Sequence, residues 1–305
     1  MSFPLVILAA GLSSRYGHLK QVDPLGPSGE SIMTYNMYDA ARAGFDSFLI
    51  VTRPEIEVEI RNHISTVVGD SFPIKYVHQT LDRIPEPQAL SADRDRPWGT
   101  GHAVICASAH IENSFAVANA DDLYGAEAFS GLFEGMVSSS DDPVLVTYSL
   151  QNTLSEHGGV NRGVCTLNKD GFLRGISEFT DVHRSSSGIT GKGSDDHLTS
   201  LSGDSPVSMN LWGLTKPFVE RMEEQFKEFL RESQGDTSKE FFLPDAVGVQ
   251  IQGGMIEVAV VETEGEWLGV TFPSDRERAV RLLGKKMDQG YYSRSLAQDF
   301  RNNLS

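Results

Sequence analysis

The segment that most constrains the fold is residues 4–20, PLVILAAGLSSRYGHLK. Its apolar run, Leu5–Ala9, predicts a buried parallel strand, because strands covered on both faces read as continuous hydrophobic runs. The run leads into a turn of small residues around Gly11, followed by Arg15 and Lys20. A tight turn at the carboxyl end of such a strand presents backbone N–H groups where anions and nucleotides bind in open α/β sheets. Two cations beside those amides suit a polyphosphate.

Taken alone, this turn does not identify a ligand. It matches neither the GxxxxGK[ST] phosphate loop nor the GxGxxG dinucleotide fingerprint. An ordinary strand-to-helix turn, with Gly11 at its bend and two solvated cations, accounts for the same residues. Other motifs in the chain are needed to distinguish a polyphosphate-binding turn from an ordinary strand-to-helix turn.

Composition places the chain among globular proteins. It has 305 residues, of which 39% are hydrophobic and 22% charged, enough to bury a core without disulfides. It has no apolar run near the ~18 residues of a membrane-spanning helix and no signal-peptide pattern, so we expect a cytoplasmic protein. Cys106 and Cys165 show neither metal-ligand nor redox spacing and are predicted to be buried free thiols.

The charge balance restricts the partners. Lys and Arg number 26 against 42 Asp and Glu, a net charge of −16. This balance argues against nucleic acid and against an anionic membrane as partners, since both need a basic face. A small phosphorylated ligand remains compatible, because salt screens long-range repulsion beyond ~10 Å. The sequence leaves the oligomeric state open.

Residues 1–150 alternate between strand and helix patterns. Strands are expected at residues 5–9, 48–52, 74–77, 115–119 and 144–148, and helices at 31–43, 54–67, 102–109 and 126–137. Such alternation with short connections predicts an α/β fold with a doubly wound, mostly parallel sheet.

The pattern changes in residues 151–305. We expect a hairpin of strands 160–167 and 172–178, further strands at 207–214 and 256–261, and helices at 216–231 and 274–287. Residues 185–206, rich in Ser, Gly and Asp, are predicted to be a mobile loop, either a lid or a surface excursion. One sheet continuing through both halves would make residues 1–305 a single domain, with a smaller antiparallel lobe on the substrate side.

A second motif follows the strand at 115–119, which delivers Asp121 and Asp122 to its carboxyl end. A carboxylate there, opposite a cationic turn, is a natural ligand for Mg²⁺ on a substrate phosphate. The alternative is that both acids cap the helix at 126–137.

A third motif is the segment 97–103, PWGTGHA. Gly99 and Gly101 flank Thr100, so the backbone there can approach a flat ring closely. Gln79, after the strand at 74–77, is placed to contact a base with its amide, although a lone Gln is more often only a polar strand terminus.

Together the three motifs resemble the nucleotidyltransferases that join a nucleoside triphosphate to a sugar 1-phosphate, the nucleotide-diphospho-sugar pyrophosphorylases. LAAGLSSRYGHLK is similar to their LAAGxGxRxx…K signature, WGTGHAV to their base-binding segment, and NADDLYG to their metal motif. The resemblance covers most of the chain. It implies a Rossmann-like sheet with residues 1–150 as the nucleotide-binding half and 151–305 as the acceptor-binding half.

The resemblance also implies residue roles. Arg15, Lys20 and Asp121 would be catalytic, with Asp121 as a ligand of Mg²⁺. The implied nucleotide contacts are Leu8, Ala10, Gly11, Gln79, Gly99 and Thr100. The implied acceptor contacts are Gly163, Glu178 and Asn210.

Two positions depart from the family pattern. Phe179 stands after Glu178 where the family often has Lys, and His183 or Arg184 are the alternatives for binding the acceptor phosphate.

Gly269 stands where a second metal carboxylate is common. Thr271 or Asp275 could replace it, or the second ligand could come from elsewhere, and we assign Asp275 to the metal.

The implied reaction is attack of an acceptor phosphate on the α-phosphorus of a nucleoside triphosphate, with release of pyrophosphate. A phosphomonoester has its second pKa near ~6 and needs no general base at neutral pH. The alternatives are transfer to a non-sugar phosphate such as phosphocholine, a glycosyltransferase of the same architecture, and a non-catalytic nucleotide-binding regulatory subunit.

Overall fold

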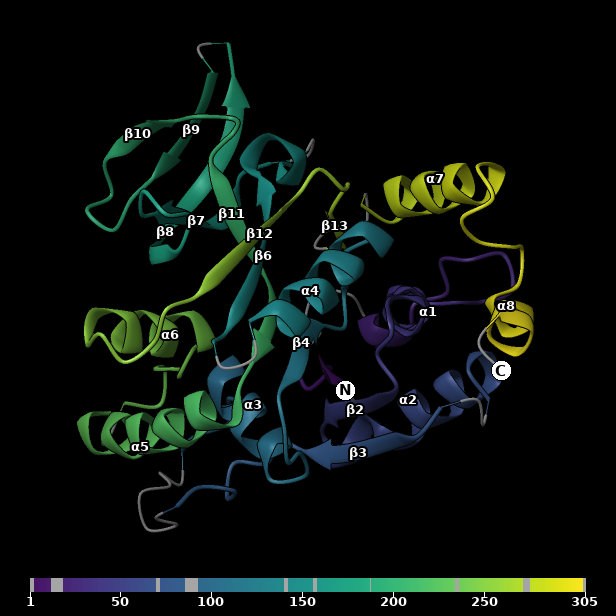
Figure 1. Ribbon diagram of the computed structural model, residues 1–305, viewed down its shortest axis with the longest axis horizontal. Coiled ribbons are helices and arrows are strands. Elements are labelled where there is room, and N and C mark those ends of the chain that lie inside the picture. The colour runs from purple at the N-terminus through teal and green to yellow at the C-terminus, as the bar shows by residue number, and fades with distance from the viewer. Residues whose placement is uncertain are drawn as a thin grey trace.

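A computed structural model describes residues 3–11, 19–69, 72–85, 93–139, 142–155, 158–186, 188–233, 236–270 and 275–303. One continuous sheet runs through both halves of the chain (Figure 1). Its first part is parallel, in the order β3-β2-β1-β4. These strands are β1 (Pro4–Leu8), β2 (Ser47–Thr52), β3 (Ile74–His78) and β4 (Phe115–Asn119).

An antiparallel strand joins this part to the rest of the sheet. β11 (Pro206–Leu214) pairs antiparallel with β4 and with β6 (Val144–Ser149), and β12 (Ala259–Thr263) is parallel to β6. Antiparallel pairing continues outward from β11 through β7 (Val160–Leu167), β8 (Leu173–Ser185), β9 (Gly188–Lys192) and β10 (Leu198–Leu201). A separate pair is formed by β5 (Asp122–Leu123) and β13 (Leu268–Gly269).

Helices cover both faces of the sheet (Figure 1). They are α1 (Ile32–Ala43), α2 (Pro54–Val67), α3 (Thr100–Ser108), α4 (Ala126–Ser138), α5 (Lys216–Glu232), α6 (Leu243–Gln252), α7 (Asp275–Asp288) and α8 (Leu296–Asn303). Short 3-10 turns lie at η1 (Lys20–Val22) and η3 (Leu150–Thr153).

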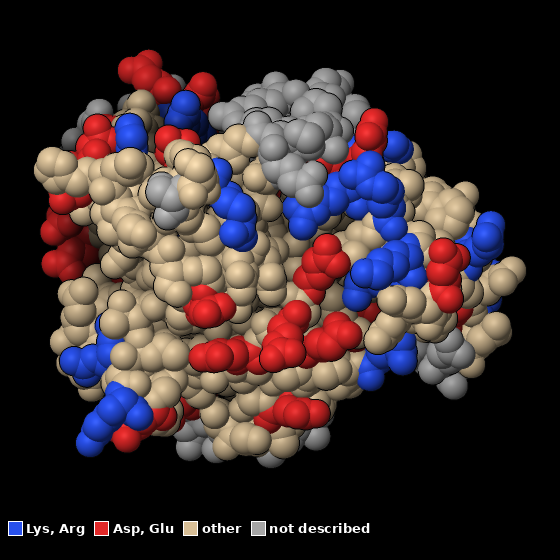
Figure 2. All heavy atoms as spheres, turned by 90° about the horizontal axis from the view of Figure 1, so that it is seen from above, with Lys and Arg blue, Asp and Glu red and all other residues tan. Residues whose placement is uncertain are grey.

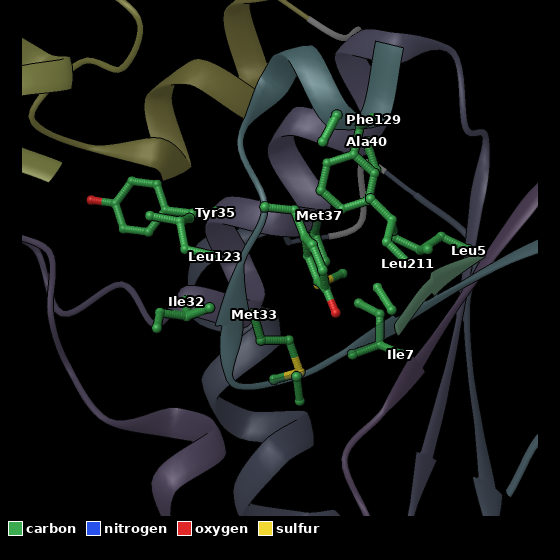
Figure 3. Packing of buried hydrophobic residues seen from close by; sticks show 14 of the residues in the cluster. Leu5, Ile7, Ile32, Met33, Tyr35, Met37, Ala40, Leu123, Phe129 and Leu211 are labelled. Carbon is green, nitrogen blue, oxygen red and sulfur yellow. The ribbon is translucent and has the colours of Figure 1, made fainter. Parts of the chain in front are cut away.

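Alternate residues of β1 enter two different cores. Leu5 and Ile7 pack in the core that contains Met37 of α1 and Phe129 of α4 (Figure 3). Val6 points the other way, into the core of α3, α5 and α6. Successive strand side chains face opposite sides of a sheet, so a continuous apolar run fits a strand buried on both faces. The predicted α/β fold is confirmed, with a sheet whose central part is parallel and whose outer strands, from β11 to β10, pair antiparallel.

The predicted boundaries hold where local signals are strong. Gly44 ends α1 in the left-handed region, with φ of 113°, as expected for a residue without Cβ. Asn168 Oδ1 accepts hydrogen bonds from the N–H groups of Asp170 and Phe172 at 2.9 Å, which closes the predicted β7–β8 hairpin. Both cysteines are buried and free, also as predicted.

The predicted mobile loop at 185–206 is wrong. β8 continues to Ser185, and much of the remaining segment forms β9 and β10. β9 pairs with β8 and β10; Ile189 and Gly191 of β9 are buried, whereas three of the four residues of β10 are exposed. Strands that bury so few side chains show little alternation of apolar and polar residues, so their Ser- and Gly-rich sequence resembles a loop.

The short helices α6 and α8 were not predicted, and the predicted strand at 256–261 begins only at Ala259. The helix expected from 274 is present as α7 from Asp275, while residue 274 lies outside the described residues.

On the face shown in Figure 2, acidic side chains form rows, and basic side chains gather beside them. Among the described residues, no helix is long and apolar enough to cross a membrane.

A buried carboxylate ties the C-terminal segment to α1. The Tyr292 hydroxyl donates to Asp39 Oδ2 at 2.7 Å, and Oδ1 of Asp39 has no partner among the described residues. Burial raises the pKa of Asp39 from 3.8 to about 7, although Tyr292 and nearby Lys286 and Arg42 act in the opposite direction. The charged form therefore destabilises the folded state.

We predict that Asp39→Asn is more stable than the wild type at pH 8, by about 1–3 kcal/mol, since one pKa unit corresponds to about 1.4 kcal/mol. Asn keeps an oxygen acceptor for Tyr292 and carries no charge. The folded wild type takes up a proton as pH falls through 7, whereas the unfolded chain does so only near 3.8, so the advantage should shrink toward pH 5.

Urea unfolding at pH 8 and pH 5 measures this difference. Asp82→Asn, at an exposed position, is the control and should leave the pH dependence unchanged. An Asp39→Asn protein that is less stable than wild type at pH 8 would contradict the assignment.

Candidate active site

A cavity of about 660 Å³ opens at the carboxyl ends of β1, β3 and β4. Its lining includes all six residues predicted to contact a nucleotide, and also Asp121. The described lining consists of Leu8, Ala10, Gly11, Gln79, Asp95, Arg96, Pro97, Gly99, Thr100, Ala103, Asn119, Asp121 and Glu240. The three sequence motifs therefore meet in one place, as expected for the carboxyl edge of a parallel sheet.

Backbone bonds hold the first turn at this edge. The N–H of Ala9 donates to Val51 O at 2.8 Å, and the N–H of Ala120 donates to Leu8 O at 3.2 Å. The Gln21 side chain donates to Gly11 O at 3.2 Å. Residues 8–11, which lead into the turn, are thus fixed to β2, to the end of β4 and to η1. Arg15 lies outside the described residues.

Lys20 and Asp121 form an ion pair, with Nζ and Oδ2 2.6 Å apart. The two side chains are 17% and 38% exposed, so the pair is partly screened by solvent and water can reach the carboxylate. Lys20 approaches from η1, and Asp121 follows β4. The cation after the first turn and the acid after the fourth strand are thus direct neighbours.

The neighbouring acid, Asp122, faces a different environment. The Asn119 side chain donates to Asp122 Oδ2 at 2.8 Å, and the Asn36 side chain donates to its backbone oxygen at 2.6 Å. Burial, followed by the charge of Asp121, raises the pKa of Asp122 to about 7. Asp121 contacts Lys20 and Asp122 contacts Asn119, which leaves little support for the alternative that these acids cap α4.

Asn210 connects β11 to the cavity wall. Its Nδ2 donates to Asn119 Oδ1 at 2.8 Å, and Trp212 Nε1 donates to its Oδ1 at 3.0 Å. Asn210 has φ of 62°, at a break in the β11–β6 register between Ser208 and Trp212. Left-handed backbone in a non-glycine residue is uncommon and concentrates at functional sites. Asn119 was missed from the sequence, although it directly precedes the acidic motif.

None of the three predicted acceptor residues lines the cavity, and the other two, Gly163 and Glu178, lie side by side. Gly163 of β7 is in register with Glu178 of β8 and with Ser208 of β11. A Cβ at Gly163 would lie 2.8 Å from Ile176 Cγ2 and 3.6 Å from Glu178 Oε2. Burial raises the pKa of Glu178. The structure brings Gly163 and Glu178 together. Asn210 lies on β11, the strand that pairs with Gly163 through Ser208, and it donates a hydrogen bond to the cavity residue Asn119.

The structure does not bring Asp275 into the cavity lining. It is buried at the start of α7. Gly269 pairs with Asp122 across β13 and β5, and a Cβ there would lie 2.9 Å from Asp122 Oδ1. Thr271 lies outside the described residues. Within the described part of the chain, no group of three His, Cys, Asp or Glu residues could hold a metal ion.

The alternatives for the acceptor phosphate, His183 and Arg184, also lie elsewhere. Both line a second hollow of about 730 Å³, together with Asp181 and Arg278. The sequence had suggested them only as replacements for a missing Lys at Phe179, and their location does not place them with Asp121.

The glycine turn is fixed by close backbone contact with the segment before α6. Gly99 has φ of 97°, and a Cβ there would lie 2.6 Å from Phe241 O. The N–H of Gly101 donates to the same oxygen at 2.9 Å, and the N–H of Phe241 donates to Trp98 O at 2.7 Å. Thr100 Oγ1 accepts from the N–H of Leu243 at 3.0 Å. Gly99 is thus required by both its backbone conformation and the space available.

Sequence reasoning missed the charged rim of this cavity, formed by Asp95, Arg96 and Glu240. The buried Arg94 holds the rim together. Its guanidinium stacks 3.6 Å over the Trp98 ring and donates to the backbone oxygens of Pro97, Thr237 and Lys239. Residues 94–97 and 237–240 are far apart in the sequence, and neither segment carries a recognisable spacing that could have indicated their contact.

Comparisons with known proteins address the fold. An inositol-1-phosphate CTP transferase from T. maritima matches with a TM-score of 0.60 and 14% identity, covering 93% of this chain and 96% of that one. HddC from Yersinia pseudotuberculosis matches with a TM-score of 0.57 and 15% identity, covering 92% and 99%. The chain shares their fold. No family model and no curated protein matches the sequence.

We predict that Gly99→Ala destabilises the protein by more than about 2 kcal/mol, because a Cβ meets the Phe241 carbonyl and the backbone is left-handed. Thermal and urea unfolding measure the loss. Gly248→Ala, inside the nearby α6 with nothing within 4 Å of the added Cβ among the described residues, is the control and should stabilise by about 0.5–1 kcal/mol. Equal effects at both positions would contradict the close contact.

Proposed function

We propose that this protein transfers a nucleoside monophosphate from a nucleoside triphosphate to a phosphorylated small-molecule acceptor, with release of pyrophosphate. The observation that carries the proposal is the Lys20–Asp121 pair at a cavity lined by all six residues expected to contact a nucleotide. The fold shared with a CTP transferase supports the same reaction class.

The chemistry demands positioning and charge neutralisation rather than a general base. Two polyanions must approach each other, and the negative charge on the departing pyrophosphate must be stabilised. Lys20 supplies a fixed cation beside the carboxylate of Asp121. Arg15, five residues earlier, is proposed to act with it.

The donor set at Asp121 suits Mg²⁺. Its carboxylate is a hard oxygen donor that water can reach, and Mg²⁺ is commonly held by one or two carboxylates together with substrate phosphates. Asp121 would hold the ion, which would neutralise phosphate charge. Lys20 would then be free to contact the triphosphate. Asp275 remains a weaker proposal for a second ligand, because it is buried away from the cavity lining.

The acceptor is proposed to be a sugar 1-phosphate, bound near Gly163, Glu178 and Asn210. These residues lie on neighbouring strands of the antiparallel part of the sheet, and Asn210 contacts the cavity residue Asn119. The similar T. maritima structure is named for an inositol 1-phosphate substrate, which supports a phosphate on a polyhydroxylated ring. We propose residues 151–305 as the acceptor-binding half.

A screen of nucleoside triphosphates against sugar 1-phosphates, inositol 1-phosphate and phosphocholine, with Mg²⁺, tests this function by pyrophosphate release. Lys20→Met and Asp121→Asn are each expected to lower turnover at least about 100-fold, the range seen when one charge-stabilising group is removed. Lys192→Met, at an exposed surface ion pair, is the control. Pyrophosphate release unaffected by Lys20→Met would overturn the assignment of Lys20.

A further inference from the structure

The side-chain amide of Gln79 has a defined orientation in the cavity wall. Its Nε2 donates to Gly99 O at 2.9 Å and lies 3.3 Å from His102 Nδ1. Both amide hydrogens are thus directed toward Gly99 of the glycine turn and His102 of α3. The amide oxygen Oε1 contacts no described hydrogen-bond partner and is not a fully buried atom. It is therefore the polar atom that Gln79 can present to a ligand.

The carbonyl of Gly99 can only accept and so requires Nε2 of Gln79 on its side, and His102 reinforces this orientation when its Nδ1 carries no proton. His102 Nε2 lies 2.7 Å from the backbone oxygen of Arg83, and a carbonyl can only accept, so Nε2 must donate. In a neutral imidazole the other nitrogen, Nδ1, is then an acceptor. That nitrogen faces Gln79 Nε2.

His102 is held as a neutral, immobile ring. It is fully buried on α3 and stacks on Phe226, with ring centroids 5.0 Å apart and an interplanar angle of 28°. Burial lowers its pKa to about 4. A neutral ring with a hydrogen-bond partner at each nitrogen can prevent a 180° rotation of the Gln79 amide. Such a rotation would exchange the positions of the amide oxygen and nitrogen.

We propose that His102 is a positioning residue that fixes the Gln79 carbonyl oxygen toward the cavity, so that the site selects a nucleobase by an N–H donor on its base-pairing edge. This inference rests on the proposed function, because it places the base beside Gln79. His102 does not touch the ligand and acts only through Gln79. A single hydrogen bond changes affinity by about two- to tenfold, enough to distinguish nucleotides.

Two substitutions separate the two ring nitrogens. In His102→Asn the amide oxygen can take the place of Nδ1 and accept from Gln79, whereas the contact with Arg83 O is lost. In His102→Gln the amide nitrogen can take the place of Nε2 and keep the Arg83 contact, whereas the acceptor for Gln79 is lost. Titration calorimetry measures binding of ATP, GTP, CTP, UTP and dTTP with Mg²⁺, and of Mg²⁺ tripolyphosphate, which has no base.

His102→Gln is expected to weaken the preferred triphosphate about tenfold, equivalent to about 1.4 kcal/mol, and to leave tripolyphosphate affinity unchanged. His102→Asn is expected to stay within about threefold of the wild type, since it retains the hydrogen-bond acceptor. Methylating the N–H donor of the preferred base should weaken binding to the wild type and to His102→Asn much more than to His102→Gln. Equal nucleotide selectivity in His102→Gln and wild type would overturn the inference while leaving nucleotide binding intact. A wild type that binds none of the triphosphates would overturn the proposed function as well.

Nitrogen NMR of the wild type gives a test that does not depend on the variants folding. The expected spectrum at pH 7 shows His102 protonated at Nε2 and unprotonated at Nδ1, with the signal identified by sequential assignment of the wild type. A His102 protonated at Nδ1 would overturn the inference, because that nitrogen could not accept from Gln79.

Discussion

The site depends on the position of β1 between β2 and β4 in the parallel part of the sheet. Leu8 is in register with Val51 on one side and with Asn119 on the other, and the backbone N–H groups of Ala9 and Ala120 continue this pairing beyond the strand ends. A slip of one residue would exchange the faces of every side chain. The buried apolar residues of β1 thus set the register that brings the first turn and the acid at Asp121 together.

The charged side chains at the carboxyl edge of the parallel strands determine which ligands this edge can bind. Lys20 and Asp121 face each other at 2.6 Å in a position that water can still reach. Because solvent partly screens this pair, separating it when other charges arrive costs less than separating a fully buried pair. Asp122 lies next to it but contacts Asn119 and Asn36 instead. The two adjacent acids therefore have different surroundings and different partners.

Much of the fold could be predicted from the sequence because its strongest signals are local. The apolar run of β1, the glycine after α1 and the turn at Asn168 each specify one structure, and the three motifs converge as predicted. The strands β9 and β10 were not predicted, because they bury few side chains and their Ser- and Gly-rich sequence resembles a loop. Sequence patterns also missed three contacts: those of Arg94 with the cavity rim, of Asn210 with Asn119, and of His102 with Gln79. These contacts join residues that are far apart in the chain, and no periodic pattern in the sequence indicates them.

The central claim is that Lys20 and Asp121 receive the phosphates of a nucleoside triphosphate and its divalent ion. The most direct test is a crystal structure of the protein with Mn²⁺ and a non-hydrolysable nucleoside triphosphate, in which anomalous scattering locates the metal. We predict Mn²⁺ bound to the Asp121 carboxylate, with the Lys20 ammonium moved from that carboxylate onto the triphosphate. A nucleotide bound away from this cavity, or a metal remote from Asp121 with the Lys20–Asp121 pair intact, would contradict the claim.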